Sequence, residues 1–310
     1  MVYDSVEWIR NGRLQLSFLA RKVQLWHGAP LKQIELPLYQ GRLSRMRPVN
    51  RVITELYNWV TARYVGSDLL ISTSCYFAEH AFSKAIKANY ILVSGYPRND
   101  ILYKSKGADS ARGGLLKLNT DDQIVSRIKE SRRDRKRIIL YMPTFRKDWH
   151  NQFDSGVLDI DRMAAFAENN DILLVFKFHP LMASYYNLDE LDSIVEYHPG
   201  GDVYPILPLC DCLITDYSSI YFDYLFVDKP IIFFPYDLEQ YTLDDRPLLF
   251  DYEEMTPGKK CYNQEALENA MMNDEDDYKS NRHTVFNKVF DYEDGDASAR
   301  IWNYIETNYY

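Results

Sequence analysis

A chain of 310 residues, 46% of them hydrophobic and with 13 Gly and 13 Pro, is long enough for one large or two medium domains with buried cores, which excludes a disordered tail, a collagen and a small disulfide scaffold. Its four cysteines are too few for a disulfide framework and lack the spacing of a zinc knuckle, so a reducing cytosol is the simplest setting. The net charge is −9, and no run of 18 residues is free of charge, so we expect neither a signal peptide nor a transmembrane helix.

Short apolar runs rich in β-branched and aromatic residues recur along the chain and have the character of buried parallel strands. In chain order the predicted strands lie at residues 22–28, 68–73, 90–95, 137–143, 172–180, 212–216 and 230–236. Helical patterns lie between and after them, at residues 74–88, 121–133, 160–169, 218–226 and 297–308. Strands that alternate with helices in this way predict an α/β protein with doubly wound, Rossmann-like sheets.

A polar, glycine-rich stretch, KSKGADSARGG at residues 104–114, predicts a domain boundary. We therefore expect an N-terminal Rossmann-like domain over residues 1–107, which is short for such a domain, and a C-terminal one over residues 108–290. The last segment, residues 291–310, contains a helix with Ile301 and Trp302 on one side, and we expect it to cross back onto the first domain.

Basic and acidic residues are unevenly divided along the chain. Residues 1–147 contain 26 Lys and Arg against 12 Asp and Glu, a net +14, whereas residues 148–310 contain 10 against 33, a net −23. The basic half predicts an anionic partner, such as a phosphate-rich polymer, a membrane surface or nucleic acid. The local basic cluster at residues 132–137 is better explained as a solvated helix end.

Polar side chains recur where predicted strands end. They are His27 with Gly28, Thr144 with Arg146, His179, and the turn Asp216-Tyr217-Ser218-Ser219. In an open parallel sheet, ligands bind in the crevice beyond the carboxyl ends of the strands. We therefore expect all four sets to face one cleft.

His27 follows the apolar VQLW and precedes Gly28, so a sharp turn is expected to present its imidazole. A histidine in this place is either a structural group held by hydrogen bonds or a general base. Gly28, which lets a ligand approach the backbone, favours the second interpretation, and Lys32 would add positive charge if a helix begins here.

His179 and Lys177 alternate on one face of the predicted strand 172–180. Two interpretations carry equal weight. The pair either binds phosphate or forms the polar lip of an apolar strand.

Residues 213–234 combine a strand, a tight polar turn, a helix and another strand. Ser218 or Ser219 is a natural N-cap, and a helix N-terminus above a strand end can bind phosphate. Asp216 in the same turn would repel phosphate, so its expected partners are a hydroxyl, a cation or a capping N–H. Simple capping of a buried helix is the competing interpretation.

Two further sites follow predicted strands. Arg146 could clamp a diphosphate, because a planar guanidinium forms bidentate hydrogen bonds. Asp237 and Glu239 could accept hydrogen bonds from ribose hydroxyls, by analogy with dinucleotide-binding folds, although the acidic half offers many other carboxylates.

Several common signatures are absent from the sequence: GxGxxG after a strand, GxxxxGK[ST], GxSxG and HExxH. Their absence argues against a dinucleotide oxidoreductase, a P-loop NTPase, an α/β-hydrolase and a zincin. The pair Asp159 and Asp161 could hold a metal ion, but its position at a helix start predicts a cap.

Taken together, five motifs between about residues 20 and 260 resemble the CDP-glycerol glycerophosphotransferases, the teichoic-acid primases and polymerases. They are WHGAPLKQIE (26–35), GYPRNDIL (95–102), YMPTFR (141–146), FKFHP (176–180) and TDYSSIYFDYLFVDKPIIFFPYDLEQY (215–241). Ala29 stands where these enzymes more often carry Thr.

The resemblance implies a GT-B fold, with two Rossmann-like domains facing across a cleft, and transfer of glycerol phosphate from CDP-glycerol to a hydroxyl with release of CMP. It implies that His27 is the base, that the N-terminal domain carries the acceptor, and that the C-terminal domain binds the CDP-polyol donor. We expect His179 to take part in catalysis as well. The expected substrate-binding residues are Gly28, Lys32, Arg98, Thr144, Arg146, Asp216, Tyr217, Ser218, Ser219, Asp237 and Glu239.

The implied partners are CDP-glycerol or CDP-ribitol, an anionic polyol-phosphate or lipid-linked glycan acceptor, and the inner face of the bacterial cell membrane, where such enzymes work as peripheral cytoplasmic proteins. No metal or other cofactor is required, because cationic side chains and a helix terminus can supply the positive charge. Nucleic acid is not an expected partner, since no RRM, KH or zinc-finger pattern is present. Three alternatives remain: a CDP-ribitol ribitolphosphotransferase, a GT-B nucleotide-sugar glycosyltransferase, and a non-catalytic polymer- or nucleotide-binding protein.

Overall fold

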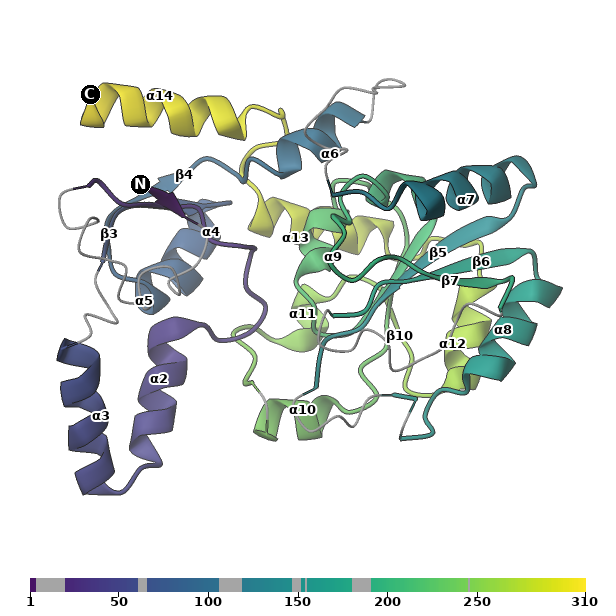
Figure 1. Ribbon diagram of the computed structural model, residues 1–310, viewed down its shortest axis with the longest axis horizontal. Helices are drawn as coiled ribbons and strands as arrows, with labels where there is room; N and C mark the ends of the chain where they lie inside the picture. The colour runs from purple at the N-terminus through teal and green to yellow at the C-terminus, as the bar shows by residue number, and fades with distance from the viewer. Residues whose placement is uncertain are drawn as a thin grey trace. The chain divides into compact units, whose positions relative to one another are not determined.

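Two parallel β-sheets organise the chain, and each belongs to one compact unit (Figure 1). Unit 1 comprises Met1–Asp100, Arg246–Phe250 and Phe286–Tyr310, and unit 2 comprises Ile101–Asp245 and Asp251–Val285. The computed structural model describes residues 1–3, 20–60, 66–105, 119–146, 152–153, 155–179, 191–244 and 246–310. Most of the polar stretch 104–114, from residue 106 on, and Pro180 lie outside these residues.

The sheet of unit 1 has four parallel strands in the order β1-β2-β3-β4. They are β1 (Val2–Tyr3), β2 (Val23–Gln24), β3 (Ser67–Ser72) and β4 (Ala88–Val93). Leu69, Leu70 and Ile71 of β3 have no exposed surface, as expected for a strand that is covered on both faces. The strand predicted at residues 22–28 is only two residues long, and β1 was not predicted because two residues show no periodicity.

The helices of unit 1 differ in part from the expected ones. The helix predicted at residues 74–88 is divided into α4 (Cys75–Phe77), a π-helical turn η2 (Ala78–Phe82) and α5 (Ser83–Ala85). Two helices were not predicted, α2 (Glu35–Ser44) and α3 (Pro48–Val60). The helix α6 (Asn99–Ser105) begins at the end of unit 1, and α14 (Ala297–Tyr309) matches the predicted terminal helix and belongs to unit 1.

The sheet of unit 2 has six parallel strands in the order β10-β9-β8-β5-β6-β7. The strands are β5 (Arg137–Met142), β6 (Ile172–Phe176), β7 (Ile194–Glu196), β8 (Cys212–Thr215), β9 (Ile231–Phe233) and β10 (Lys259–Lys260). From β5 the sheet extends to one side through β6 and β7 and to the other through β8, β9 and β10, which is the strand order of the Rossmann fold. The switch point therefore lies between β5 and β8, which pair directly.

Helices and short helical turns lie before, between and after these strands in the chain (Figure 1). They are α7 (Asp122–Arg133), α8 (Ile160–Asn169), the 3-10 turn η4 (Leu207–Leu209), α9 (Ile220–Tyr224), α10 (Leu238–Asp244), α11 (Tyr252–Met255), α12 (Gln264–Met271) and α13 (Lys279–Val289), which continues into unit 1. Asp159 caps α8, because its carboxylate accepts a hydrogen bond from the Arg162 N–H at 3.0 Å, so the predicted cap is confirmed. In the parts of the chain that the structure describes, no helix is long and apolar enough to cross a bilayer.

Candidate functional site

The ends of β5 and β8 bring two predicted site segments together in unit 2. Met142 and Thr215 are the last paired residues of the two strands. Thr144 and Arg146 follow the first strand, and Asp216 follows the second. Because parallel strands end at the same edge, all three residues lie at the topological switch point, where open α/β sheets bind ligands.

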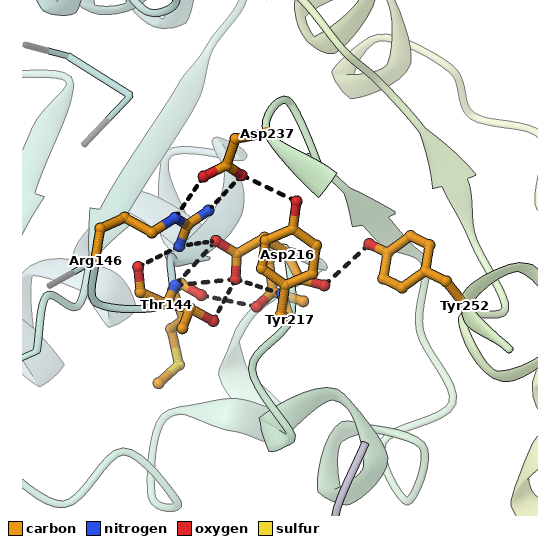
Figure 2. Close-up of polar contacts among 8 residues, drawn as sticks. Thr144, Arg146, Asp216, Tyr217, Asp237 and Tyr252 are labelled. Carbon is orange, nitrogen blue, oxygen red and sulfur yellow. Dashed lines mark hydrogen bonds and ion pairs between the residues drawn. The ribbon is translucent and has the colours of Figure 1, made fainter. Parts of the chain in front are cut away.

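Asp216 is held by all three kinds of partner that its sequence position predicts (Figure 2). Asp216 is only 2% exposed. Its carboxylate accepts hydrogen bonds from the Thr144 N–H at 2.9 Å and the Thr144 hydroxyl at 2.6 Å. It also accepts one from the Tyr217 N–H and forms an ion pair with Arg146 Nη1 at 2.8 Å. Burial by itself raises the pKa of Asp216, but the Arg146 charge and these hydrogen bonds outweigh burial, so the pKa lies below its ordinary value.

Arg146 joins Asp216 to Asp237, which follows β9. Its Nε and Nη2 donate to the two Asp237 oxygens at 2.8 and 2.9 Å, and Nη1 donates to the Thr144 carbonyl. The guanidinium carbon lies 5.1, 5.4 and 5.1 Å from the ring centroids of three tyrosines, Tyr217, Tyr236 and Tyr241. Arg146 is 6% exposed, and its guanidinium is hydrogen-bonded to oxygen atoms of the protein.

Tyrosine hydroxyls complete the cluster shown in Figure 2. Tyr217 donates to Asp237 Oδ1 at 2.9 Å, and Tyr252 donates to the Asp216 carbonyl at 3.0 Å. The rings of Tyr217 and Tyr241 stack at 4.2 Å, which connects the turn after β8 to α10. Burial raises the pKa of both Tyr217 and Tyr252, so both hydroxyls keep their protons at neutral pH.

The serine turn differs from its prediction. The helix α9 has five residues and ends at Tyr224, whereas the sequence predicted residues 218–226. Ser219 occupies the N-cap position, as the sequence predicted, but its side chain forms no capping hydrogen bond. The helix is shorter than predicted because the four residues that follow Tyr224 have turn conformations.

Lys177 and His179 lie beyond β6, which ends at Phe176 rather than at residue 180. Lys177 is buried and donates a hydrogen bond to the Pro199 carbonyl, whereas His179 is exposed and packs against the ring of Phe145 at 5.2 Å. Partial burial, and secondarily the Lys177 ammonium, lowers the pKa of His179, which favours the neutral imidazole at neutral pH.

His27 belongs to unit 1, where it follows the two-residue strand β2. The backbone turns at this point, with φ of +59° at Trp26 and +150° at Gly28. The imidazole is exposed and stacks on the Trp26 ring at 4.3 Å. A positive φ at a tryptophan is uncommon, and Gly28 supplies a conformation that other residues rarely adopt.

Three other predicted residues lie outside the Asp216 cluster. Lys32 forms an antiparallel bridge with Leu248 and is not in the first turn of a helix, because α2 begins only at Glu35. Arg98 lies over the Tyr96 ring at 4.9 Å, and Glu239 is exposed in the first turn of α10.

The cluster also contains residues that no motif singled out. Tyr236 and Tyr241 lie within the predicted segment 215–241 but were not selected, because tyrosine is common in buried cores. Tyr252 gives no local signal, since its bond partner is 36 residues away in sequence. Within the described residues, no group of three His, Cys, Asp or Glu side chains could hold a metal ion.

Comparison with known proteins identifies the family of this chain. Residues 2–307 match the family described as CDP-Glycerol:Poly(glycerophosphate) glycerophosphotransferase. The teichoic acid ribitol-phosphate polymerase TarL of Staphylococcus aureus is 32% identical over 246 residues, which cover 78% of this chain and 40% of that protein. The teichoic acid poly(glycerol phosphate) polymerase of Bacillus subtilis is 30% identical over 81% of this chain and 32% of that protein. The chain therefore spans less than half the length of these two relatives.

Solved structures show the same architecture. The wall teichoic acid polymerase TagF, in a variant soaked with CDPG, matches with a TM-score of 0.73 and 25% identity over 99% of this chain and 71% of that one. S. aureus MnaA with UDP matches with a TM-score of 0.56 at 17% identity, over 99% of this chain and 73% of that one. The predicted α/β fold of GT-B type is thereby confirmed.

Proposed function

Because the chain belongs to the CDP-glycerol:poly(glycerophosphate) glycerophosphotransferase family, we propose that it transfers glycerol phosphate from CDP-glycerol to a hydroxyl of a teichoic-acid, capsule or related glycan acceptor. The observation that carries this proposal is the family match over residues 2–307. The polar cluster at the Rossmann switch point of unit 2 supports it, because nucleotides bind at such points.

In the proposed reaction, the acceptor oxygen attacks the phosphorus of the glycerol phosphate group. The new P–O bond replaces the bond to the CMP phosphate, CMP leaves, and His27 takes the proton of the attacking hydroxyl. The exposed imidazole of His27, beside a glycine that lets a ligand approach the backbone, suits that role. Unit 1, with His27, Gly28, Lys32 and Arg98, would then serve the acceptor.

Unit 2 would bind the donor. The residues proposed for it follow strands of its sheet, and Arg146 is bonded among them: Thr144, His179, Asp216, Tyr217, Ser218, Ser219, Asp237 and Glu239. A neutral His179 can donate one ring N–H to a phosphate oxygen, and Asp237, the less buried carboxylate of the cluster, can accept a hydrogen bond from a ribose or polyol hydroxyl. No step in this scheme requires a metal ion.

CDP-ribitol is the second candidate donor, and one observation favours it. The S. aureus relative that is 32% identical is a ribitol-phosphate polymerase. The residues of the cluster do not distinguish the two polyols by charge, since both donors carry the same CDP group.

Donor choice can be decided by incubating the full chain with CDP-glycerol, CDP-ribitol or UDP-sugars, in each case with a lipid-linked glycan acceptor, and measuring CMP or UDP. CMP from CDP-glycerol alone supports the proposal, and CMP from CDP-ribitol alone reassigns the polyol. UDP release identifies a glycosyltransferase. No nucleotide release from any donor contradicts the enzymatic proposal and favours a binding protein.

A peripheral contact with the inner face of the cell membrane is also part of this proposal, and α3 supports it. Four apolar residues at helical spacing, Val49, Val52, Ile53 and Leu56, are 59 to 70% exposed on this helix. The turn before it carries Arg45 and Arg47, both exposed. An exposed apolar stripe beside arginines is the pattern of a helix that lies in the interface of an anionic bilayer.

A further inference from the structure

Arg146 contacts Thr144, Asp216 and Asp237 (Figure 2), which follow three different strands of the sheet. A guanidinium has five N–H groups. Two of them hold Asp237 in a bidentate pair, and Nη1 reaches both Asp216 and the Thr144 carbonyl. Four of the five N–H groups therefore meet protein acceptors that follow β5, β8 and β9.

The charge of the cluster does not suit a diphosphate. Two ionised carboxylates surround one guanidinium, so Arg146, Asp216 and Asp237 together carry a net charge of −1. A diphosphate that clamped this guanidinium through two hydrogen bonds would have to displace Asp216 or Asp237, and the displaced carboxylate would remain nearby as an unpaired, repelling charge.

Aromatic rings hold the guanidinium in place. Tyr217, Tyr236 and Tyr241 lie between 5.1 and 5.4 Å from its carbon, and Tyr217 also donates to the Asp237 carboxylate. Few orientations of the Arg146 side chain preserve all these contacts. The turn that contains Ser218 and Ser219 follows Asp216 and Tyr217 directly, so its position depends on the same contacts.

We propose that Arg146 is a positioning residue, which acts through Asp216 and Asp237 to fix the segments after β5, β8 and β9 in one arrangement, and that it does not contact the diphosphate of the donor. This inference rests on the proposed function. It replaces the expectation from the sequence that Arg146 clamps the diphosphate directly.

The positioning role predicts a distinctive pH dependence. The titratable groups around Asp216 are Arg146, Asp237, Tyr141, Tyr217, Tyr236 and Tyr252. Burial raises the pKa of each of these tyrosines, so they stay neutral in the working range. Burial raises the pKa of Asp216, and the positive charge of Arg146 lowers it. The pKa of Asp216 should therefore rise when Arg146 is replaced by a neutral residue.

The test compares Arg146→Gln with Arg146→Lys by the pH profile of kcat/KM for CDP-glycerol. We expect both variants to lose at least about tenfold in kcat/KM. The acid limb of the profile should move to higher pH in Arg146→Gln, which lacks the charge, and stay near the parental position in Arg146→Lys. A rise in KM at unchanged kcat, with an unmoved acid limb in both variants, would show a direct clamp and overturn the inference.

Arg282 provides a matched control in unit 2. It is likewise buried, at 2% exposed, and pairs with two aspartates. It donates to both Asp276 oxygens at 2.6 and 2.5 Å and to Asp228 at 3.1 Å. Arg282→Gln should lower the melting temperature without moving the acid limb. If Arg282→Gln moves the limb as far as Arg146→Gln does, the shift reflects lost stability and the inference fails.

Asp237→Asn provides a second variant in case Arg146→Gln does not fold. A positioning role predicts weaker catalysis, because the bidentate pair is lost, whereas a direct clamp predicts tighter CDP-glycerol binding, because a competing negative charge is removed. Tighter binding would overturn the inference.

Failure of the proposed function is distinguishable from failure of this inference. If the parental chain releases no nucleotide, the proposed function fails, and the role of Arg146 is then measured by the ¹³C shift of the Asp216 carboxyl carbon against pH. Arg146→Lys, which retains the charge, should keep the parental titration, and Arg146→Gln should move it to higher pH. An unmoved titration in Arg146→Gln would overturn the inference.

Discussion

Before His27 the backbone is strained at Trp26, and after it Gly28 allows a sharp turn, so the direction of the exposed imidazole is fixed. The φ values at Trp26 and Gly28 are positive, and the Trp26 ring stacks against the imidazole. Strain of this kind persists where the surrounding structure holds it and is frequent at functional sites. The strain, and not the burial, distinguishes His27 from an ordinary surface histidine.

His27→Ala should lower turnover of CDP-glycerol by about 10² to 10⁴, because the attacking hydroxyl loses its general base. Affinity for the donor, measured by calorimetry, should stay largely intact, since the donor is proposed to bind unit 2. His80→Ala serves as a control in unit 1, where that histidine stacks on Tyr76. A His27→Ala enzyme that works at the parental rate would remove the assignment.

His179 offers a test of local electrostatics. Burial lowers its pKa first, and the Lys177 charge lowers it further, so Lys177→Met should raise the pKa of His179 as measured by NMR titration of the imidazole. Because the pKa of His179 is lowered in the native state, the unfolded chain, whose histidines titrate near 6.5, binds a proton more readily than the native protein. The free energy of unfolding should therefore fall as the pH drops through about 6.5. Lys129→Met, an exposed change on α7, should leave the titration unchanged. An unshifted His179 in Lys177→Met would contradict the assigned cause.

At the scale of elements, the buried strands of both sheets were largely predictable, and the short or exposed elements were not. The runs at residues 137–143 and 212–216 predicted β5 and β8 because strands buried on both faces are continuously apolar. The strands β1 and β10 have two residues each, too few for a pattern. The π turn at Ala78–Phe82 has no sequence signature, so a continuous helix was expected there.

The apolar stripe of α3 predicts binding to anionic vesicles. Ile53→Asp should reduce co-sedimentation with phosphatidylglycerol vesicles at least about tenfold, since burying a large aliphatic side chain contributes about 1.5 to 3 kcal/mol. Leu243→Asp on α10 is the matched control, because Leu243 is 73% exposed but lies outside the stripe. Equal binding by the parental chain and Ile53→Asp would reject α3 as the membrane contact.

At the scale of the whole molecule, unit 1 is assembled from three separate stretches of the chain. Asp100 joins two of them, because its carboxylate accepts hydrogen bonds from the N–H groups of Ala297 and Ser298 at 2.9 and 3.0 Å and from the Ser298 hydroxyl at 2.7 Å. Arg300 adds a hydrogen bond to the Ser94 carbonyl at 3.0 Å. The start of α14 is therefore anchored to the segment that follows β4.

Asp100→Ala should lower the free energy of unfolding by about 1 to 3 kcal/mol, because the buried Ala297 N–H and the partly buried Ser298 N–H lose their acceptor. Hydrogen exchange should accelerate first in α14. Ser298→Ala, which removes only the hydroxyl bond, should cost less. Unchanged exchange in α14 after Asp100→Ala would show that its packing, through Ala297 and Ile301, suffices.

The sequence by itself determined the fold class, the main strands and the polar residues that end them, because apolar runs and turn residues act locally along the chain. The five motifs also sufficed to indicate the family. Only the tertiary structure decided what those polar residues contact. Arg146 and Asp237 are 91 residues apart, and Asp216 lies 72 residues from Thr144, so no local pattern could show that the guanidinium faces two carboxylates and three tyrosines. Local periodicity specifies which face of a strand is buried. The partner of a charged group depends instead on the order in which the strands pair, and that order is set only when the whole sheet folds.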